Sequence, residues 1–212
     1  MSTVSFDVVG ARVEAYAAVP TLVLRLRAAA ADDQRVHAIV LRCQIMIEPH
    51  RRTYSDEEEV RLAELFGETP RWGDTLRPFL WTNVATTISG FVGTSELDLP
   101  ITCTYDFEIA AAKYMHSLDH GEIPIVVMFS GTVFGRSETG LSTAPVSWSE
   151  ESSYRLPVTL WRDMMDLYFP HTGWLRLRRE TLDVLLRYKA DRGLLTWDET
   201  VEHLLKQAGE DV

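Results

Sequence analysis

Strict alternation of apolar and polar residues in the first half of the chain is the feature that most limits its fold. In the segment RVHAIVLRCQIMIEP, residues 35–49, every second side chain from His37 to Ile47 belongs to one set, which is almost entirely apolar. A period of two places such a set on one face of an extended strand and leaves the other face polar. The pattern therefore predicts a half-buried strand that is closed by Pro49.

A second alternating run, PTLVLRLRA at residues 20–28, precedes this strand and has Leu22, Leu24 and Leu26 on one face. The intervening ADDQ is a turn signal, so the two runs are predicted to form a hairpin. Segments rich in β-branched and aromatic residues predict further strands. They lie at 79–93, 95–109 and 122–135, with Pro100 indicating an edge strand or a bulge and 136–143 read as a loop.

Helical patterns interrupt and follow these strands. Residues 54–67 begin with Ser55 and Glu58, which form a capping box, and end at Gly67. Three more helices are predicted in the last quarter, at 156–170, 180–193 and 196–210, and the last of them opens with a capping box of Thr196 and Glu199. The chain is thus predicted to be an α+β protein: an antiparallel β-sandwich domain at 1–148 with a short inserted helix, and a helical C-terminal appendage at 149–212 packed on the sandwich.

The charge balance limits the function classes. The formal net charge is −10, with −8 in residues 1–150 and −2 in residues 151–212. A sequence-independent nucleic-acid binder needs a basic surface, and an anionic membrane attracts basic segments, so neither partner is expected. No stretch of 18 apolar residues or secretory signal pattern occurs, and the two cysteines form no CxxC pair, which favours the cytoplasm.

No familiar nucleotide or hydrolase motif is present, because GxGxxG, GxxxxGK[ST] and GxSxG are all absent. Cys43 and Cys103 both fall on inward faces of predicted strands, which favours packing over nucleophilic catalysis, although a pair of Cys103 with His171 stays open. Asp32, Asp33 and Asp119 are weak candidates for calcium-binding loops. No cofactor is expected.

His116 and His120, in KYMHSLDHGEIP, are weak candidates for metal ligands. Their spacing would place two imidazoles on one face of a helix over 108–120. The apolar stripe of that helix runs along Phe107, Ala111, Tyr114 and Leu118, so the histidines would face solvent, and a zinc site needs a third ligand. The interpretation favoured here is an ordinary helix end, with Gly121 after it.

Two aromatic and basic segments are candidate partner surfaces. Alternation in GWLRLRR places Trp174, Arg176 and Arg178 on one face of an extended segment, a composition common at protein interfaces. The alternatives are a solvated basic face, which is favoured, and a nucleic-acid contact. The loop TPRWGDTLRPFLW around Trp72 is either a plug over the end of the sandwich, which is favoured, or a binding rim.

Three stretches carry a family resemblance: RWGDTLRPFLWT, DLPITCTYDFEIAAAKYMHSLDHGEIPIVVMFSGTVF and YFPHTGWLRLRRETLDVLLRYKADRGLLTWDETVEHLL. Through them the chain, from about residue 13 to 206, resembles an uncharacterised actinobacterial family defined only as a domain of unknown function. Genes of that family tend to lie beside those for [NiFe]-hydrogenase subunits and maturation factors. The resemblance implies a role in hydrogenase assembly, chaperoning or scaffolding, and it brings no known active site.

The expected function is therefore a non-enzymatic accessory, adaptor or assembly protein that binds another protein. A hydrogenase subunit or maturation factor is the expected partner, and Trp72, Trp174, Arg176 and Arg178 are the expected contact residues. The alternative is an enzyme or small-ligand carrier with a pocket between the sandwich and the tail helices. Oligomeric state is left open.

Overall fold

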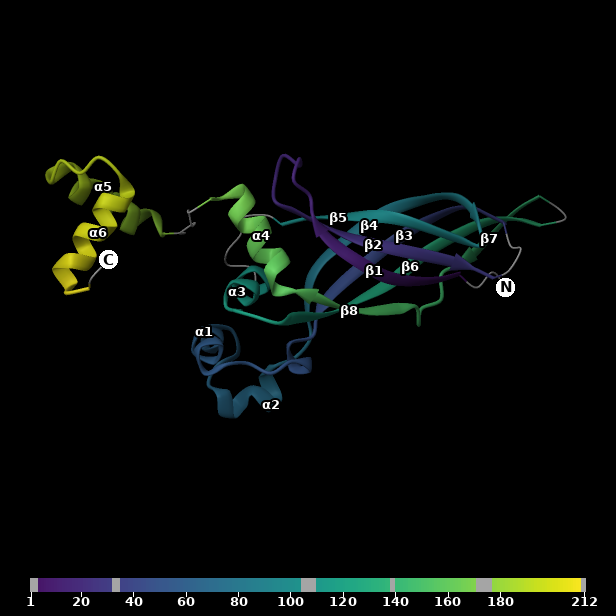
Figure 1. Ribbon diagram of the computed structural model, residues 1–212, viewed down its shortest axis with the longest axis horizontal. Helices are drawn as coiled ribbons and strands as arrows, with labels where there is room; N and C mark the ends of the chain where they lie inside the picture. Colours follow the sequence, from purple (N-terminus) through teal and green to yellow (C-terminus); the bar gives the residue numbers. More distant parts are fainter. Residues whose placement is uncertain (1–3, 32–34, 104–109, 138–139, 171–176, 211–212) are drawn as a thin grey trace. The chain divides into compact units, whose positions relative to one another are not determined.

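A computed structural model describes residues 4–31, 35–103, 110–137, 140–170 and 177–210. Within these ranges, eight strands form two antiparallel sheets (Figure 1). The first sheet has the order β1-β2-β5, and the second has the order β4-β3-β6-β7, with β8 also paired to β6. The strands are β1 (Val4–Val13), β2 (Thr21–Ala30), β3 (Arg35–Ile47), β4 (Phe79–Val92), β5 (Thr94–Thr102), β6 (Glu122–Ser137), β7 (Gly140–Pro145) and β8 (Glu151–Pro157).

The two sheets pack face to face through the alternating apolar sets, which confirms the α+β sandwich architecture. Leu22, Leu24 and Leu26 of β2 are fully buried, as predicted. Phe6 of β1 stacks on Phe129 of β6 with ring centroids 4.9 Å apart, so the interior side chains of the two sheets are in direct contact. At one edge of the sandwich the Val8 N–H of β1 donates to Ser152 Oγ of β8 at 3.0 Å.

The predicted hairpin between residues 20–28 and 35–49 is wrong. β2 pairs with β1 and β5, whereas β3 pairs with β4 and β6, so the two strands belong to different sheets. Alternation identifies the face that a strand buries, but it does not identify the neighbouring strand. Two strands bury an apolar face in a shared core whether they pair in one hairpin or belong to different sheets, so the pattern does not separate these cases.

Smaller differences from the predicted strands have local causes. His37 is exposed and Val36 is buried instead, because the pairing of β3 with β6 shifts register between Val36 and Ala38. The predicted loop at 136–143 is largely strand, since β6 runs to Ser137 and pairs with β7. β1 was not predicted at all. Pro100 does lie on an edge strand, because β5 pairs only with β2 within the described part of the chain.

Helices gather at one end of the sandwich (Figure 1). They are α1 (Asp56–Phe66), α2 (Trp72–Thr75), α3 (Ala110–His116) and α4 (Val158–Tyr168), with short 3-10 turns at Pro49–Arg51 and Thr69–Arg71. The capping box of Ser55 and Glu58 is present at the start of α1, as predicted. Ala111, Tyr114 and Leu118 are buried, which confirms the described part of the predicted apolar stripe.

The contacts divide the chain into two compact units, 1–173 and 174–212. The first unit contains β8 and α4, which had been expected in a helical segment beginning at residue 149; α4 contacts β1, β2 and β8. The second unit contains α5 (Arg179–Asp191) and α6 (Trp197–Ala208), and α6 begins with the capping box of Thr196 and Glu199. Packing of a helical appendage on the sandwich stays a prediction.

Candidate functional site: a buried arginine–glutamate network

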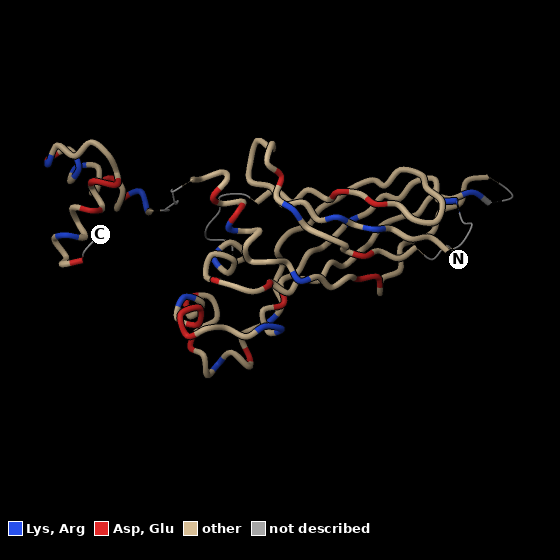
Figure 2. Tube along the Cα trace, viewed as in Figure 1, with Lys and Arg blue, Asp and Glu red and all other residues tan. Residues whose placement is uncertain are grey.

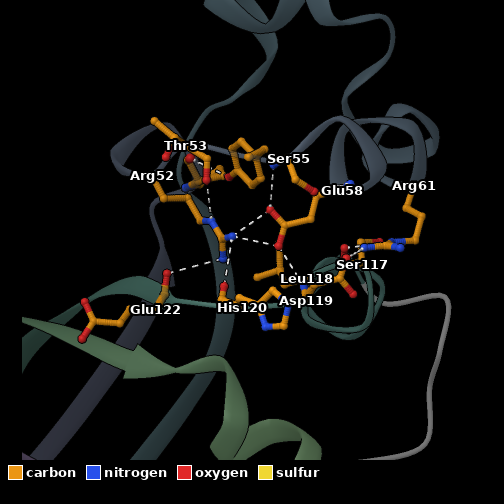
Figure 3. A network of polar contacts seen from close by, with 12 residues as sticks. Arg52, Thr53, Ser55, Glu58, Arg61, Ser117, Leu118, Asp119, His120 and Glu122 are labelled. Atoms are coloured by element: carbon orange, nitrogen blue, oxygen red, sulfur yellow. Dashed lines mark hydrogen bonds and ion pairs between the residues drawn. The ribbon is translucent and has the colours of Figure 1, made fainter.

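The best-organised polar centre in the described residues joins Arg52 to Glu58 (Figure 3). Arg52 Nη2 lies 2.9 Å from both carboxylate oxygens of Glu58. The two side chains are only 9% and 4% exposed, so this is a buried ion pair. Burying two charges costs free energy unless they are paired and hydrogen-bonded to further groups.

Local sequence explains the position of Glu58. It is the third residue of α1, where its carboxylate accepts the Ser55 N–H at 3.2 Å while Ser55 Oγ accepts the Glu58 N–H at the same distance. The helix dipole also favours an anion in this first turn. A distant backbone group completes the set, because the Asp119 N–H donates to Glu58 Oε1 at 2.8 Å. The carboxylate is therefore satisfied by one guanidinium and two amides.

Arg52 uses its remaining N–H groups on backbone carbonyls. Nε donates to Thr53 O at 3.2 Å, Nη2 to His120 O at 3.3 Å, and Nη1 to Glu122 O at 3.5 Å. These bonds tie the segment after β3 to the segment between α3 and β6. The arrangement holds two loops and a helix start together, and it leaves the guanidinium few donors for a ligand.

Asp119 extends the network toward α4. Its carboxylate pairs with Arg61 of α1 and, at 3.0 Å, with Arg162 of α4. The hydrogen bond from Arg61 is the main reason that the pKa of Asp119 is lowered, with smaller contributions from the charges of both guanidinium groups. Both carboxylate oxygens thus already bind cations, which disfavours Asp119 as a calcium ligand; Asp32 and Asp33 lie outside the described residues.

An aromatic cluster packs under the network. Tyr54 Oη lies 2.8 Å from Tyr114 Oη and donates to Pro49 O at 2.6 Å. Burial raises the pKa of Tyr54 strongly and that of Tyr114 to about 12, so both phenols stay protonated at neutral pH. The ring of Trp72 meets the ring of Tyr54 edge to face at 5.3 Å.

Two open grooves flank these residues. One is lined by His50, Arg51, Arg155 and Glu122 as well as by Arg52. Arg51 is engaged by Glu48 at 3.1 Å, so the charge along this groove is mixed. The other groove runs from Tyr54 along the start of α1 to Asp119. Every charged side chain of the network that lines this groove is paired with another side chain. The arrangement therefore supports a structural role, in which the network holds the loops together.

The structure does not assemble a metal site from the histidine pair. α3 ends at His116, four residues earlier than predicted, so His120 does not lie one helical turn further along the same helix. Both side chains are exposed, as expected, and the His116 ring packs edge to face against Trp161 at 5.5 Å. Partial desolvation by such neighbours lowers the pKa of His116. Within the described residues no three His, Cys, Asp or Glu side chains gather in a metal-binding arrangement.

Trp72 has a packing role. It is 6% exposed, and its indole N–H donates to Gly67 O at 2.8 Å. This supports the plug interpretation of the 69–81 loop and leaves Trp72 almost no surface for a partner, contrary to its expected place among the contact residues. Of the other three, Arg178 is exposed at the start of α5, whereas Trp174 and Arg176 lie outside the described residues.

Both cysteines are buried, as predicted, and burial raises the pKa of each thiol to about 12. A nucleophile must be an accessible thiolate, and neither condition is met. Cys103 instead donates weakly to Ile101 O at 3.6 Å. His171, its possible partner, lies outside the described residues.

Alkylation with iodoacetamide at pH 8 tests this description of Cys43 and Cys103. The native protein is expected to gain no adduct over hours, because the thiols are buried and protonated, whereas the protein in guanidinium is expected to gain one adduct on each cysteine. Intact-mass spectrometry reads both results. Rapid single labelling of the native chain would contradict the burial of one thiol.

The network was missed at the sequence level, although part of its signal was visible. The capping box of Ser55 and Glu58 predicts a helix start, but a carboxylate in an acidic first turn is ordinarily exposed to solvent. Burial of Glu58 depends on Arg52 and on the backbone of Asp119, which satisfy its carboxylate. No local pattern indicates that a segment 61 residues away donates to this side chain.

Fold and site together define an α+β sandwich protein whose main polar centre is structural. The chain belongs to the family described as "Family of unknown function (DUF6084)", whose model matches residues 1–212. No curated protein matches the chain in sequence. None of the helices in the described ranges has the length and apolar character that a membrane crossing requires.

Two of the solved structures that resemble the chain are β-glucosidases, and both likenesses are distant. A β-glucosidase from Kluyveromyces marxianus is 8% identical with a TM-score of 0.29, and 73% of this chain covers 15% of that one. β-Glucosidase 3B from Thermotoga neapolitana, in complex with α-D-glucose, is 14% identical with a TM-score of 0.26, and 73% of this chain covers 17% of it. The chain thus spans less than a fifth of either enzyme, and likenesses this weak carry no argument.

Proposed function

We propose that this protein is a non-enzymatic adaptor in the cytoplasm that binds another protein, and that the partner is a [NiFe]-hydrogenase subunit or maturation factor. The observation that supports binding is the edge strand β4. It is 14 residues long and pairs only with β3 among the described strands. An exposed edge presents unpaired N–H and C=O groups, to which an extended segment of another chain can add.

β4 lacks the features that usually protect an edge. From Phe79 to Val92 it contains no charged residue and no proline, and its register with β3 is unbroken from Thr82 to Val92. One edge strand of the other sheet, β5, carries Glu96, Asp98 and Pro100. Such charges and prolines oppose pairing with a further strand. Because β4 lacks such charges and prolines, it is favoured over β5 as the binding edge.

Apolar side chains along β4 would also gain from a partner. Trp81, Val84 and Phe91 pack against the core but are only partly buried, unlike the fully buried Ile39 and Leu41 of the inner strand β3. A segment added beside β4 would cover part of this surface as well as pair with the backbone. The hydrogenase identity of the partner rests on the family resemblance alone.

Affinity purification from the native host, followed by mass spectrometry, tests the proposal. Tagged wild type is expected to recover hydrogenase subunits or maturation factors. A variant with Thr87→Lys and Ser89→Lys, both exposed on β4, is expected to lose them, because charge on an edge opposes strand addition. Recovery of the protein alone at native expression would count against the partner hypothesis.

Val40→Lys is the matched control for the edge. Val40 of β3 is 47% exposed and pairs with Thr87, so the substitution adds a lysine beside the altered position but on an inner strand of the same sheet. It is expected to keep the recovered partner. Retention by the β4 variant as well would place the binding surface elsewhere on the protein.

A further inference from the structure

The centre of the larger sheet carries a single charged side chain, Arg42 of β3. Residues 38–46 of β3, 80–89 of β4 and 126–134 of β6 contain no other charged residue, and β4 carries none in Figure 2. Arg42 is exposed on the outward face of this sheet, and within the described residues its side chain has no ion pair and no hydrogen bond. A guanidinium without a counter-ion, among uncharged neighbours, is a group with which a carboxylate of another chain can pair.

The smaller sheet shows how an arginine on a sheet is usually matched. On its outward face Arg25 of β2 lies directly opposite Asp98 of β5 and pairs with that carboxylate at 3.1 Å. Opposite charges on neighbouring strands stabilise a sheet. Arg42 instead lies opposite Ala85 of β4 and Ser130 of β6, which have no charge. Neither of the two strands that flank Arg42 therefore supplies its counter-ion.

A strand added beside β4 can supply this counter-ion. Side chains that lie opposite each other on neighbouring strands point to the same face, so the residue opposite Ala85 would lie in one row with Arg42. Neighbouring strands are about 4.8 Å apart, which places that residue about 10 Å from Arg42 between Cα atoms. Ala85 between them has only a methyl group, so the arginine and a carboxylate side chain can meet above it.

We propose that the segment that adds to β4 carries an Asp or Glu opposite Ala85, and that Arg42 pairs with this carboxylate. The inference rests on strand addition at β4 and names the chemistry of the partner. Because side chains alternate along a strand, the residues before and after the carboxylate would point inward, beside the half-buried Val84 and Thr86. The partner is expected to present an extended segment in which an acidic residue stands between two apolar ones.

Two other sources of the added strand fit less well. β4 of a second copy contains no Asp or Glu, so pairing of two β4 strands would leave both Arg42 side chains unmatched. Residues 177–210 of the same chain form α5 and α6 and contain no strand, so they provide no strand neighbour for this edge. An acidic segment of a different protein is therefore favoured.

Fluorescence anisotropy with three labelled peptides tests the inference on the full chain. The peptides alternate Val and Thr and differ only in one central residue of the Thr set, which is Glu, Gln or Lys. Wild type is expected to bind the Glu peptide about three- to fivefold more tightly than the Lys peptide, as an exposed ion pair allows. The net charge of −10 acts against this order, so the overall charge of the protein cannot produce it.

Arg42→Glu is expected to reverse the order, so that the Lys peptide binds more tightly than the Glu peptide. Arg155→Glu is the matched control, because Arg155 of β8 is exposed on the same sheet and its replacement changes the net charge equally. This control is expected to keep the order of wild type, and far-UV circular dichroism checks that both variants are folded. An unchanged order in Arg42→Glu would overturn the proposal.

The variant with Thr87→Lys and Ser89→Lys separates this inference from strand addition itself, and it is expected to bind none of the peptides. Binding that depends on β4 but shows no preference among the three peptides would overturn only the pairing with Arg42. If wild type bound no peptide, or if the β4 variant bound them as wild type does, strand addition at β4 would be overturned and this inference with it.

Discussion

Replacing Glu58 with alanine is expected to lower the free energy of unfolding by about 3–5 kcal/mol, because the substitution leaves the Arg52 guanidinium buried without its counter-ion. It also strips the acceptor from the amides of Ser55 and Asp119. Both losses fall where two loops and the start of α1 meet. Urea denaturation followed by tryptophan fluorescence measures the change.

Glu57→Ala is the control for Glu58. Glu57 is in the same first turn of α1 but is exposed, so its loss should lower the stability far less than the loss of Glu58 does. Replacing both members of the pair, Arg52→Met with Glu58→Leu, should cost less than Glu58→Ala alone, since no buried charge is left unpaired. If Glu58→Ala behaved like Glu57→Ala, the pair would not be a significant source of stability.

Gly131→Ala is the other substitution with a large expected effect. Gly131 of β6 has φ +151°, and a Cβ at this position would lie 2.0 Å from Val40 O of β3. The clash is with backbone, so β6 and β3 would have to separate at the centre of the larger sheet. A loss of about 3 kcal/mol or more is expected, with a clear fall in the thermal midpoint by calorimetry.

Gly10→Ala provides the comparison for Gly131. Gly10 of β1 has ordinary backbone geometry, and a Cβ there would meet its nearest neighbour, Arg25 Cβ, at 3.9 Å, which is normal van der Waals contact. This variant is expected to be nearly neutral. Equal destabilisation by the two alanines would mean that glycine flexibility, not the approach of Val40 O, governs Gly131.

Much of the fold could be predicted from local pattern. Alternation placed Leu22 and Ile39 in the core, and the capping boxes located the starts of α1 and α6. These predictions succeeded because burial of one strand face and satisfaction of helix-end amides depend on nearby residues. The prediction of strand partners failed, because β2 pairs with β5, which lies about 75 residues further along the chain.

The site could be predicted less well for the same reason. The exposure of His116 and His120 followed from the stripe of α3, but the early end of that helix did not. Burial of Glu58 required Arg52 on one side and the Asp119 amide on the other. A charged residue in an acidic helix start is normally solvated, and only tertiary contacts make this one different.

The hydrogen bond from Val8 to Ser152 has a consequence for synthesis of the protein. It links strands 144 positions apart, and β6, the strand that pairs with β3, β7 and β8, does not begin until residue 122. A ribosome adding residues from the N-terminus thus releases β1 to β5 before the larger sheet has its central member. Such high contact order slows folding, and the apolar faces of the early strands stay exposed to solvent in the meantime. Nascent chains that end before β8 are expected to be the form most in need of chaperones.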